Sequence, residues 1–125
     1  MISTVLVVDD SKMSRKVNLA LVRELLGNEV NYLDASGGAE ALEMLQSTAI
    51  DLMLLDLTMP NVSGYDVLVA MRKLNLATQV IVISADIQPA AKERVMSLGA
   101  AGFIEKNIKP EVLRGMLVKL GVFHD

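Results

Sequence analysis

The chain has 125 residues, a length typical of one domain, and 52% of them are hydrophobic, which favours a folded core over a disordered segment. Its formal net charge of −3 argues against a nucleic-acid-binding protein, which usually carries a basic surface. There is no cysteine, so disulfides and thiolate metal sites are excluded, and the one histidine, His124, disfavours a histidine-based zinc site.

Short runs of β-branched and apolar residues alternate along the chain with segments of helical period. The predicted strands span residues 4–9, 29–34, 50–56, 79–84 and 102–106. The predicted helices span residues 12–26, 37–47, 64–75, 89–98 and 110–120. This alternation indicates an α/β fold, a doubly wound five-stranded parallel sheet with helices on both faces.

The expected helix starts carry residues that favour them, in chain order Ser11, Ser36, Ser63 with Asp66, Pro89 and Pro110. A serine hydroxyl can accept a hydrogen bond from a first-turn N–H, and an acid three residues later completes a capping box. Proline fits the first turn of a helix. The buried stripe of the first helix is expected to comprise Met13, Val17, Leu21 and Leu25.

The first residues of the sequence do not resemble a signal peptide. The apolar run after Met1 is about five residues long, whereas a signal peptide needs a longer run behind a basic start. No run approaches the roughly 18 residues of a membrane span. We expect a cytoplasmic protein without a membrane partner, consisting of one domain over residues 1–125 with no effector domain.

Three acids follow two of the predicted strands. Asp9 and Asp10 close the first strand, and Asp56 closes the third. If these strands are neighbours in a parallel sheet, the three carboxylates converge on one crevice. Like charges about 4 Å apart repel by about 1 kcal/mol in water and by about 4 kcal/mol at an effective dielectric constant near 20. The trio therefore predicts a bound cation, a raised pKa, or both.

Two further polar residues are expected at the same edge of the sheet. Ser84 follows the fourth strand and Lys106 the fifth. The acids would hold a hard cation, the cation and Lys106 would neutralise phosphoryl oxygens, and Ser84 would donate a hydrogen bond. Mg²⁺ fits because it takes one or two carboxylates, keeps several waters and shares phosphate oxygens. The set predicts phosphoryl chemistry, for which a protein mainly supplies positioning and charge stabilisation.

In these residues the chain closely resembles the receiver domains of two-component response regulators, in particular the stand-alone chemotaxis type. The matching segments are Val7-Val8-Asp9-Asp10-Ser11, Asp34-Ala35-Ser36-Gly37, Leu54-Leu55-Asp56-Leu57-Thr58-Met59-Pro60, Ser63-Gly64, Ser84-Ala85, Gly99-Ala100-Ala101-Gly102-Phe103 and Lys106. The resemblance implies a flavodoxin-like (βα)5 fold with strand order 2-1-3-4-5, which places the first and third strands side by side.

The resemblance also implies a role for each acid. Asp56 would be the phosphoacceptor, whose carboxylate attacks a phosphohistidine on a histidine kinase or phosphotransfer protein and becomes an acyl phosphate. Asp10, Asp56 and the backbone carbonyl of Thr58 would bind Mg²⁺, and Asp9 would contribute through water. Thr58 and Asp86, each two residues beyond a site residue, would tune hydrolysis of the phosphoryl group.

By the same resemblance, Lys106 would pair with the phosphoryl group, Ser84 would move toward it, and Phe103 would turn inward as the switch aromatic. The family's usual output face corresponds here to about residues 89–120, which a downstream protein or a phosphatase would bind. The chain would act as a monomer or weak dimer. It would not be an enzyme, except that it assists its own phosphorylation and dephosphorylation.

The residue after Lys106 departs from the family, because most receivers have proline there and this chain has Asn107. A cis bond before a residue other than proline costs about 2.5–4 kcal/mol, so we predict that Lys106–Asn107 is trans. A Lys-Pro pair occurs three residues later, which makes Lys109 an alternative functional lysine. The alternation of residues 102–106 predicts a strand that ends at the sheet edge with Lys106. This position favours Lys106 over Lys109 as the functional lysine.

Two other classes compete with a phosphorylated switch. One is a docking module with the same fold and a degenerate site, against which the intact set of acids, serine and lysine argues. The other is an enzyme, but haloacid-dehalogenase-like phosphatases separate their two acids by one residue and Toprim enzymes need a glutamate after the first strand. Arg15 and Lys16, beside the acids, either steer an anionic partner or form an ordinary solvated face.

Overall fold

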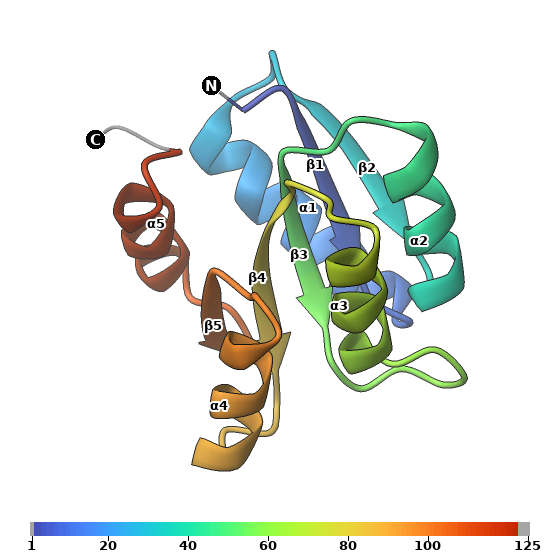
Figure 1. The fold of residues 1–125 in the computed structure, drawn as a ribbon. Helices are drawn as coiled ribbons and strands as arrows, with labels where there is room; N and C mark the ends of the chain where they lie inside the picture. The colour runs from blue at the N-terminus through green and yellow to red at the C-terminus, as the bar shows by residue number, and fades with distance from the viewer. Residues whose placement is uncertain (1, 123–125) are drawn as a thin grey trace.

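The computed structural model describes residues 2–122, so His124 lies outside the described residues. The strands are β1 Thr4–Val8, β2 Asn31–Ala35, β3 Leu52–Asp56, β4 Gln79–Ser84 and β5 Gly102–Glu105 (Figure 1). The helices are α1 Lys12–Leu26, α2 Gly38–Ser47, α3 Gly64–Lys73, α4 Pro89–Ser97 and α5 Pro110–Lys119. Within residues 2–122, no helix combines the length and the apolar character needed to cross a membrane.

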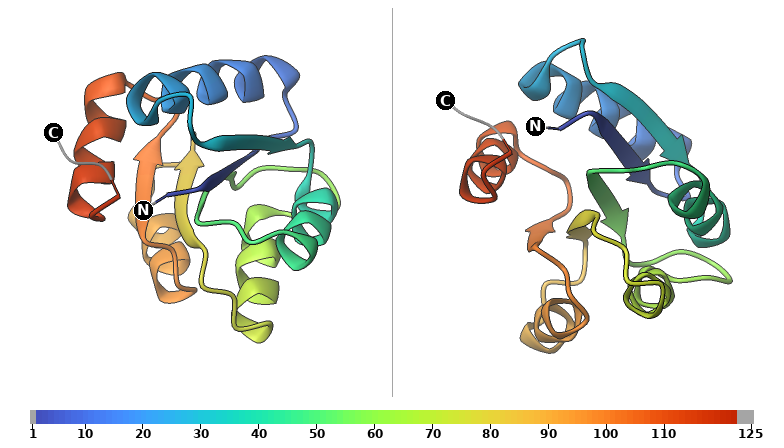
Figure 2. Two further views of the ribbon diagram at one scale, coloured as in Figure 1. Left: turned by 90° about the horizontal axis from the view of Figure 1, so that it is seen from above. Right: turned by 45° about the horizontal axis from the view of Figure 1, so that its top comes forward.

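The five strands form one parallel sheet in the order β2-β1-β3-β4-β5. Helices α1 and α5 cover one face, and α2, α3 and α4 cover the other (Figure 2). The predicted fold class and strand order are confirmed. Because β1 and β3 are neighbours, with Val8 in register with Leu55, their carboxyl ends lie side by side.

The sheet separates two hydrophobic cores. Alternate residues of β1 point to opposite faces, so that Leu6 and Val8 enter the core under α2, α3 and α4, while Val5 and Val7 enter the core under α1 and α5. Every residue of β1 and β3 is buried. Burial on both faces explains why these strands appear in the sequence as continuous apolar runs.

Helix α1 buries a different face from the one predicted. Met13 and Val17 are 70% and 55% exposed, whereas Asn18 and Val22 are buried. Met13 precedes Val22 by about two and a half helical turns and therefore lies on the opposite side of the helix. The prediction for Met13 and Val17 was wrong because it could not assign the polar side chain of Asn18 to the buried face.

The helix starts agree with the prediction except at α2. Ser11 accepts a hydrogen bond from the N–H of Ser14, and Ser63 forms the predicted capping box with Asp66. At α2 the cap is Gly37 and no side chain caps the helix, so the prediction for Ser36 was wrong. The helix begins one residue later than expected, and the backbone N–H of Ser36 donates instead to the carboxylate of Glu40, at 2.8 Å.

The peptide bond between Lys106 and Asn107 is cis, so the predicted trans bond was wrong. The preference for trans describes a peptide bond without other constraints. Here Lys106, the residue before the bond, is held by two hydrogen bonds. The backbone N–H of Lys106 donates to the carbonyl of Ser84 at 2.8 Å, and its Nζ donates to Asp9 at 3.0 Å. The local preference takes no account of these contacts.

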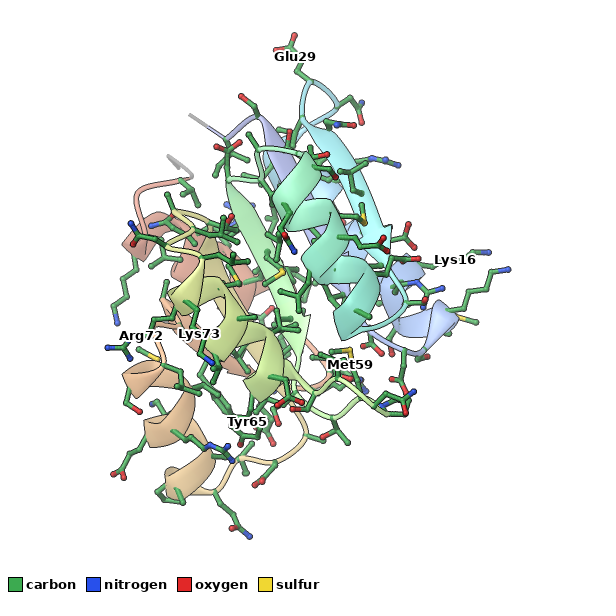
Figure 3. All side chains as sticks on the ribbon, turned by 45° about the vertical axis from the view of Figure 1, so that its right-hand side comes forward. Lys16, Glu29, Met59, Tyr65, Arg72 and Lys73 are labelled. Atoms are coloured by element: carbon green, nitrogen blue, oxygen red, sulfur yellow. The ribbon has the colours of Figure 1, made fainter. Side chains whose placement is uncertain are left out.

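Contacts at both ends of α3 join it to α4. Near the start of α3, the guanidinium carbon of Arg94 lies 3.9 Å from the centre of the Tyr65 ring. Near its end, Arg72 Nη1 donates to the carbonyl of Ser97 at 2.9 Å. Figure 3 labels Tyr65 and Arg72 at opposite ends of α3. The two ends of α3 are therefore both linked to the last turn of α4.

Candidate functional site

Three carboxylates meet at the carboxyl ends of β1 and β3. One carboxylate oxygen from each of Asp9, Asp10 and Asp56 lies within 4.8 Å of the others. Asp9 and Asp56 are buried, at 1% and 5% exposure, and Asp10 is exposed. The convergence that the sequence predicted is present, and it places three hard oxygen donors around a single point.

Lys106 supplies the positive charge next to these acids. Its Nζ lies 3.0 Å from Oδ2 of Asp9 and 3.8 Å from Oδ2 of Asp56. Lys106 directly follows β5, so it lies at the same edge of the sheet as the carboxyl ends of β1 and β3. Lys109, the alternative, precedes α5 as its exposed N-cap residue. Of the two lysines, Lys106 is the one that contacts the acids.

Burial raises the pKa of Asp56 from its ordinary value of 3.8 to about 6, and the neighbouring charge of Asp9 adds to the rise. Lys106 and the backbone N–H of Thr58 lower that pKa, but not enough to offset burial, and Asp10 raises it slightly. Without a cation in the site, the ionised form of Asp56 is therefore disfavoured in the folded protein. A cation among the three carboxylates would relieve this penalty.

The pKa of Lys106 is shifted as well. Burial by itself would lower the pKa of this ammonium, but the hydrogen bond to Asp9 and the charges of Asp56 and Asp9 outweigh it, and the net result is a raised pKa. Lys106 is thus a permanent cation at neutral pH. It partly neutralises the acid cluster and holds Asp9 in place.

Ser84 lies at the end of β4, beside the end of β3. It is fully buried, and it follows Ile83, whose partner in the sheet is Asp56. Its Oγ accepts a hydrogen bond from the backbone N–H of Asp86 at 3.0 Å, and Asp86 in turn accepts from Gln88 at 3.1 Å. These bonds fix the start of the loop between β4 and α4. The predicted tuning residue Asp86 is exposed in this loop.

Phe103 and Thr58 occupy the remaining predicted positions. Phe103, in β5, is half-buried against the core under α2, α3 and α4. Thr58 is exposed in the loop between β3 and α3, directly after the buried end of β3. The structure places both next to the strands that carry the acids and lysine. Their expected roles, as switch aromatic and as metal ligand and tuning residue, stay predictions.

Close packing fixes the loop that carries Thr58. A Cβ atom on Gly64 would lie 2.6 Å from the carbonyl oxygen of Asp56, so only glycine fits at the start of α3. The N–H of Gly64 donates to the carbonyl of Leu57 at 3.0 Å. On the other side, a Cβ on Gly38 would lie 2.6 Å from Val62. Figure 3 labels Met59, a buried residue of the same loop.

Sequence reasoning missed the position of Arg15. Instead of facing an anionic partner, Arg15 donates from Nη1 to the carbonyl of Asp9 at 2.8 Å and from Nε to Asp34 at 3.0 Å. Asp34 belongs to β2, the neighbour of β1. An arginine in the first turn after the acids, together with an acid in the adjacent strand, was the signal that could have revealed this contact.

The acid cluster has the donor set of a hard divalent cation. Carboxylate oxygens are the ligands that Mg²⁺ and Ca²⁺ prefer, and Mg²⁺ commonly uses one or two of them with several waters. The exposure of Asp10 gives solvent and small ligands access to the cluster. The residues present therefore fit a magnesium site, and two of the three carboxylates, those of Asp9 and Asp56, are buried beside the ammonium of Lys106.

Comparison with known proteins points to one family. The model of the response regulator receiver domain matches residues 5–118. The chain is 37% identical over 116 residues to the probable transcriptional regulatory protein NarL of Mycobacterium tuberculosis, covering 90% of this chain and 52% of that protein. It is 34% identical over 113 residues to the nitrate/nitrite response regulator NarP of Escherichia coli, covering 87% of this chain and 50% of that protein. The chain thus spans about half the length of these curated relatives.

Solved structures give the same result. The chemotaxis protein CheY4 of Vibrio cholerae has a TM-score of 0.84 and 26% sequence identity, over 95% of this chain and 98% of that one. The signal receiver domain of the putative response regulator NarL from Mycobacterium tuberculosis has a TM-score of 0.77 and 32% identity, over 95% of both chains.

Proposed function

Because the chain belongs to the response regulator receiver domain family, we propose that it is a phosphorylated switch of two-component signalling, with Asp56 as the phosphoacceptor. The observation that carries the proposal is the placement of a buried Asp56 beside two further acids and 3.8 Å from the ammonium of Lys106. A carboxylate held among these groups is suited to accept a phosphoryl group once a cation balances the charge.

Asp9, Asp10 and Asp56 would hold Mg²⁺, with the backbone carbonyl of Thr58 as a further ligand. When bound, Mg²⁺ offsets the negative charge of the carboxylates and of the phosphoryl oxygens. The rigid loop after β3 supports this assignment, since Gly64 packs against the carbonyl of Asp56 and fixes the path of the chain through Thr58.

In the proposed reaction, an oxygen of Asp56 attacks the phosphorus of a phosphohistidine on a histidine kinase or phosphotransfer protein. A phosphorus–oxygen bond forms, the phosphorus–nitrogen bond breaks, and the imidazole leaves with the electron pair. Lys106 Nζ, now hydrogen-bonded to Asp9, pairs with a phosphoryl oxygen. The hydroxyl of Ser84 would move to donate to another, and because its Oγ also accepts from the N–H of Asp86, this movement would displace the start of the β4–α4 loop.

The output would be a changed protein-binding surface over about residues 89–120. Met96 on α4 and Val112 and Val118 on α5 have exposed apolar side chains that such a partner would cover. A movement of Ser84 would displace α4 through the β4–α4 loop. Phe103, in β5, would then turn inward. The partner would be a downstream target or a phosphatase in the cytoplasm, and the chain would not act as an enzyme on external substrates.

Phosphorylation with a small donor tests the proposal. We expect acetyl phosphate to add one phosphoryl group, read by intact mass, only when Mg²⁺ is present, and we expect beryllofluoride to shift the amide spectrum of α4 and β5. Asp56→Ala should abolish both effects, whereas Glu43→Ala, which removes an exposed acid of α2 with no role in the site, should retain them. Failure of both reagents on the unaltered protein would overturn the proposal and favour a docking module without phosphoryl chemistry.

A further inference from the structure

We propose that Arg15 is a positioning residue for the metal site, which orients the Asp9–Asp10 peptide so that Asp10 faces the cation. This inference rests on the proposed function, because it concerns the same Mg²⁺ site. It assigns Arg15 a role through the backbone and not as a ligand.

The guanidinium of Arg15 joins two strands at the edge of the sheet. From the first turn of α1, Nη1 donates to the carbonyl oxygen of Asp9 at 2.8 Å, while Nε donates to Oδ2 of Asp34 in β2 at 3.0 Å. The Arg15 side chain is 15% exposed and that of Asp34 48%. One planar guanidinium with two donors at fixed separation is thus locked between two acceptors, a geometry that lysine cannot reproduce.

The contact between Arg15 and the carbonyl oxygen of Asp9 fixes the backbone that leads into Asp10. The carbonyl of Asp9 belongs to the peptide bond that leads into Asp10, and because a peptide unit is planar, fixing this oxygen fixes the direction of the next Cα. The N–H of Asp9 is held as well, by the carbonyl of Ala35 at 3.2 Å. The backbone of Asp9 is therefore tied to the end of β2 on both sides.

Asp10 depends on this backbone more than its neighbours do. The carboxylate of Asp9 is held by the N–H of Ser11 at 2.9 Å and by Lys106 at 3.0 Å. Asp10 is exposed, and among residues 2–122 no hydrogen bond holds its carboxylate. Its position within the acid cluster is consequently set by the peptide that Arg15 fixes. Groups that orient metal ligands typically account for 10–100-fold in metal affinity.

The positioning role and a simple charge effect predict opposite signs. Arg15 is a cation near a cation site, so if only its charge mattered, its removal would tighten Mg²⁺ binding. If it positions Asp10, its removal weakens binding. Lys16 provides a matched control, since it is the next residue, carries the same charge and is exposed, as Figure 3 shows at the right-hand edge of the molecule.

The test is Mg²⁺ titration by calorimetry of the full chain and of Arg15→Met, Lys16→Met and Arg15→Lys. We expect Arg15→Met to raise the Kd for Mg²⁺ about tenfold, within the range for residues that orient metal ligands, and Lys16→Met to leave it unchanged or slightly lowered. In phosphorylation by acetyl phosphate, Arg15→Met should need about tenfold more Mg²⁺ for half-maximal rate, while the rate at saturating Mg²⁺ stays within about threefold. A merely structural role would lower the melting temperature in EDTA without changing the Mg²⁺ requirement.

The outcomes separate this inference from the proposed function. If the unaltered protein binds Mg²⁺ and is phosphorylated, but Arg15→Met binds Mg²⁺ as tightly as Lys16→Met, the inference is overturned and the proposed function stands. If Arg15→Met does not fold, Arg15→Lys decides, because it keeps the charge but cannot span both acceptors: an unchanged Kd overturns the inference and a weaker one supports it. If the unaltered protein binds no Mg²⁺, both fall together.

Discussion

Replacing Asp56 by asparagine should stabilise the metal-free protein, and the gain should depend on pH. Burial and the charge of Asp9 raise the pKa of Asp56 to about 6, so at neutral pH the folded protein holds this carboxylate ionised in a place that disfavours its charge. Asparagine has nearly the same shape as the protonated acid and does not titrate. The substitution therefore removes the penalty of ionisation while leaving the packing at the end of β3 in place.

The size of the effect follows from the shift in pKa. Asp56 would titrate near 3.8 in the unfolded chain and near 6 in the folded protein. At about 1.4 kcal/mol for each pKa unit, this difference corresponds to up to about 3 kcal/mol. Because the folded pKa is the higher one, the stability conferred by protonation is fully present below pH 3.8 and is lost as the pH rises through 6. The variant should thus match the unaltered protein near pH 4 and exceed it by up to about 3 kcal/mol at pH 7.5.

Urea unfolding in EDTA at pH 4.5, 6.0 and 7.5 measures this difference directly. Asp86→Asn, which changes an exposed acid of the neighbouring loop, serves as the control and should show no such trend. An Asp56→Asn variant that is no more stable than the unaltered protein at pH 7.5, or whose advantage does not shrink toward pH 4.5, would refute the claim that the site disfavours its own charge.

Two further substitutions test the packing and the charge balance of the site. Gly64→Ala would place its Cβ 2.6 Å from the carbonyl of Asp56, so it should lower the free energy of unfolding by about 1–3 kcal/mol and weaken Mg²⁺ binding. Gly115→Ala is the control, because nothing lies within 4 Å of its added Cβ. It should raise the free energy of unfolding, measured in urea, by about 0.5–1 kcal/mol. Lys106→Met leaves the buried carboxylate of Asp9 without its cation and should cost about 3 kcal/mol, and most of this loss should disappear in the double variant with Asp9→Asn, as a double-mutant cycle would show.

The fold and the acid cluster were predictable because both follow from strong local signals. Strands buried on two faces appear as continuous apolar runs, as in β1 and β3, and the residues after parallel strands meet at one edge. Asp9, Asp56 and Lys106 come together for this reason, although they are far apart in the chain. The comparison with the receiver family adds the strand order, which the periodicity of the sequence alone does not contain.

The errors arose where a side chain depends on contacts distant in sequence. Hydrophobic periodicity assigned Met13 and Val17 to the buried face of α1, but the helix buries the polar side chain of Asn18 instead. For Arg15 the sequence suggests either steering of an anionic partner or a solvated face, and neither includes the contact with Asp34, because Asp34 lies in a strand whose position depends on the sheet order. The expected trans bond after Lys106 likewise rests on a local preference alone, whereas Lys106 contacts Ser84 and Asp9, which are far from it in sequence.

The most direct test of the account is chemical trapping of the phosphorylated residue. Borohydride reduces an acyl phosphate to an alcohol, so treating the protein with acetyl phosphate and Mg²⁺ and then with borohydride should convert Asp56 to homoserine, which peptide mass spectrometry identifies. We expect conversion at Asp56 only, and none when Mg²⁺ is replaced by EDTA. Conversion at Asp9 or Asp10 instead, or equal conversion of Asp56 in EDTA, would contradict the assignment of Asp56 as a metal-assisted phosphoacceptor.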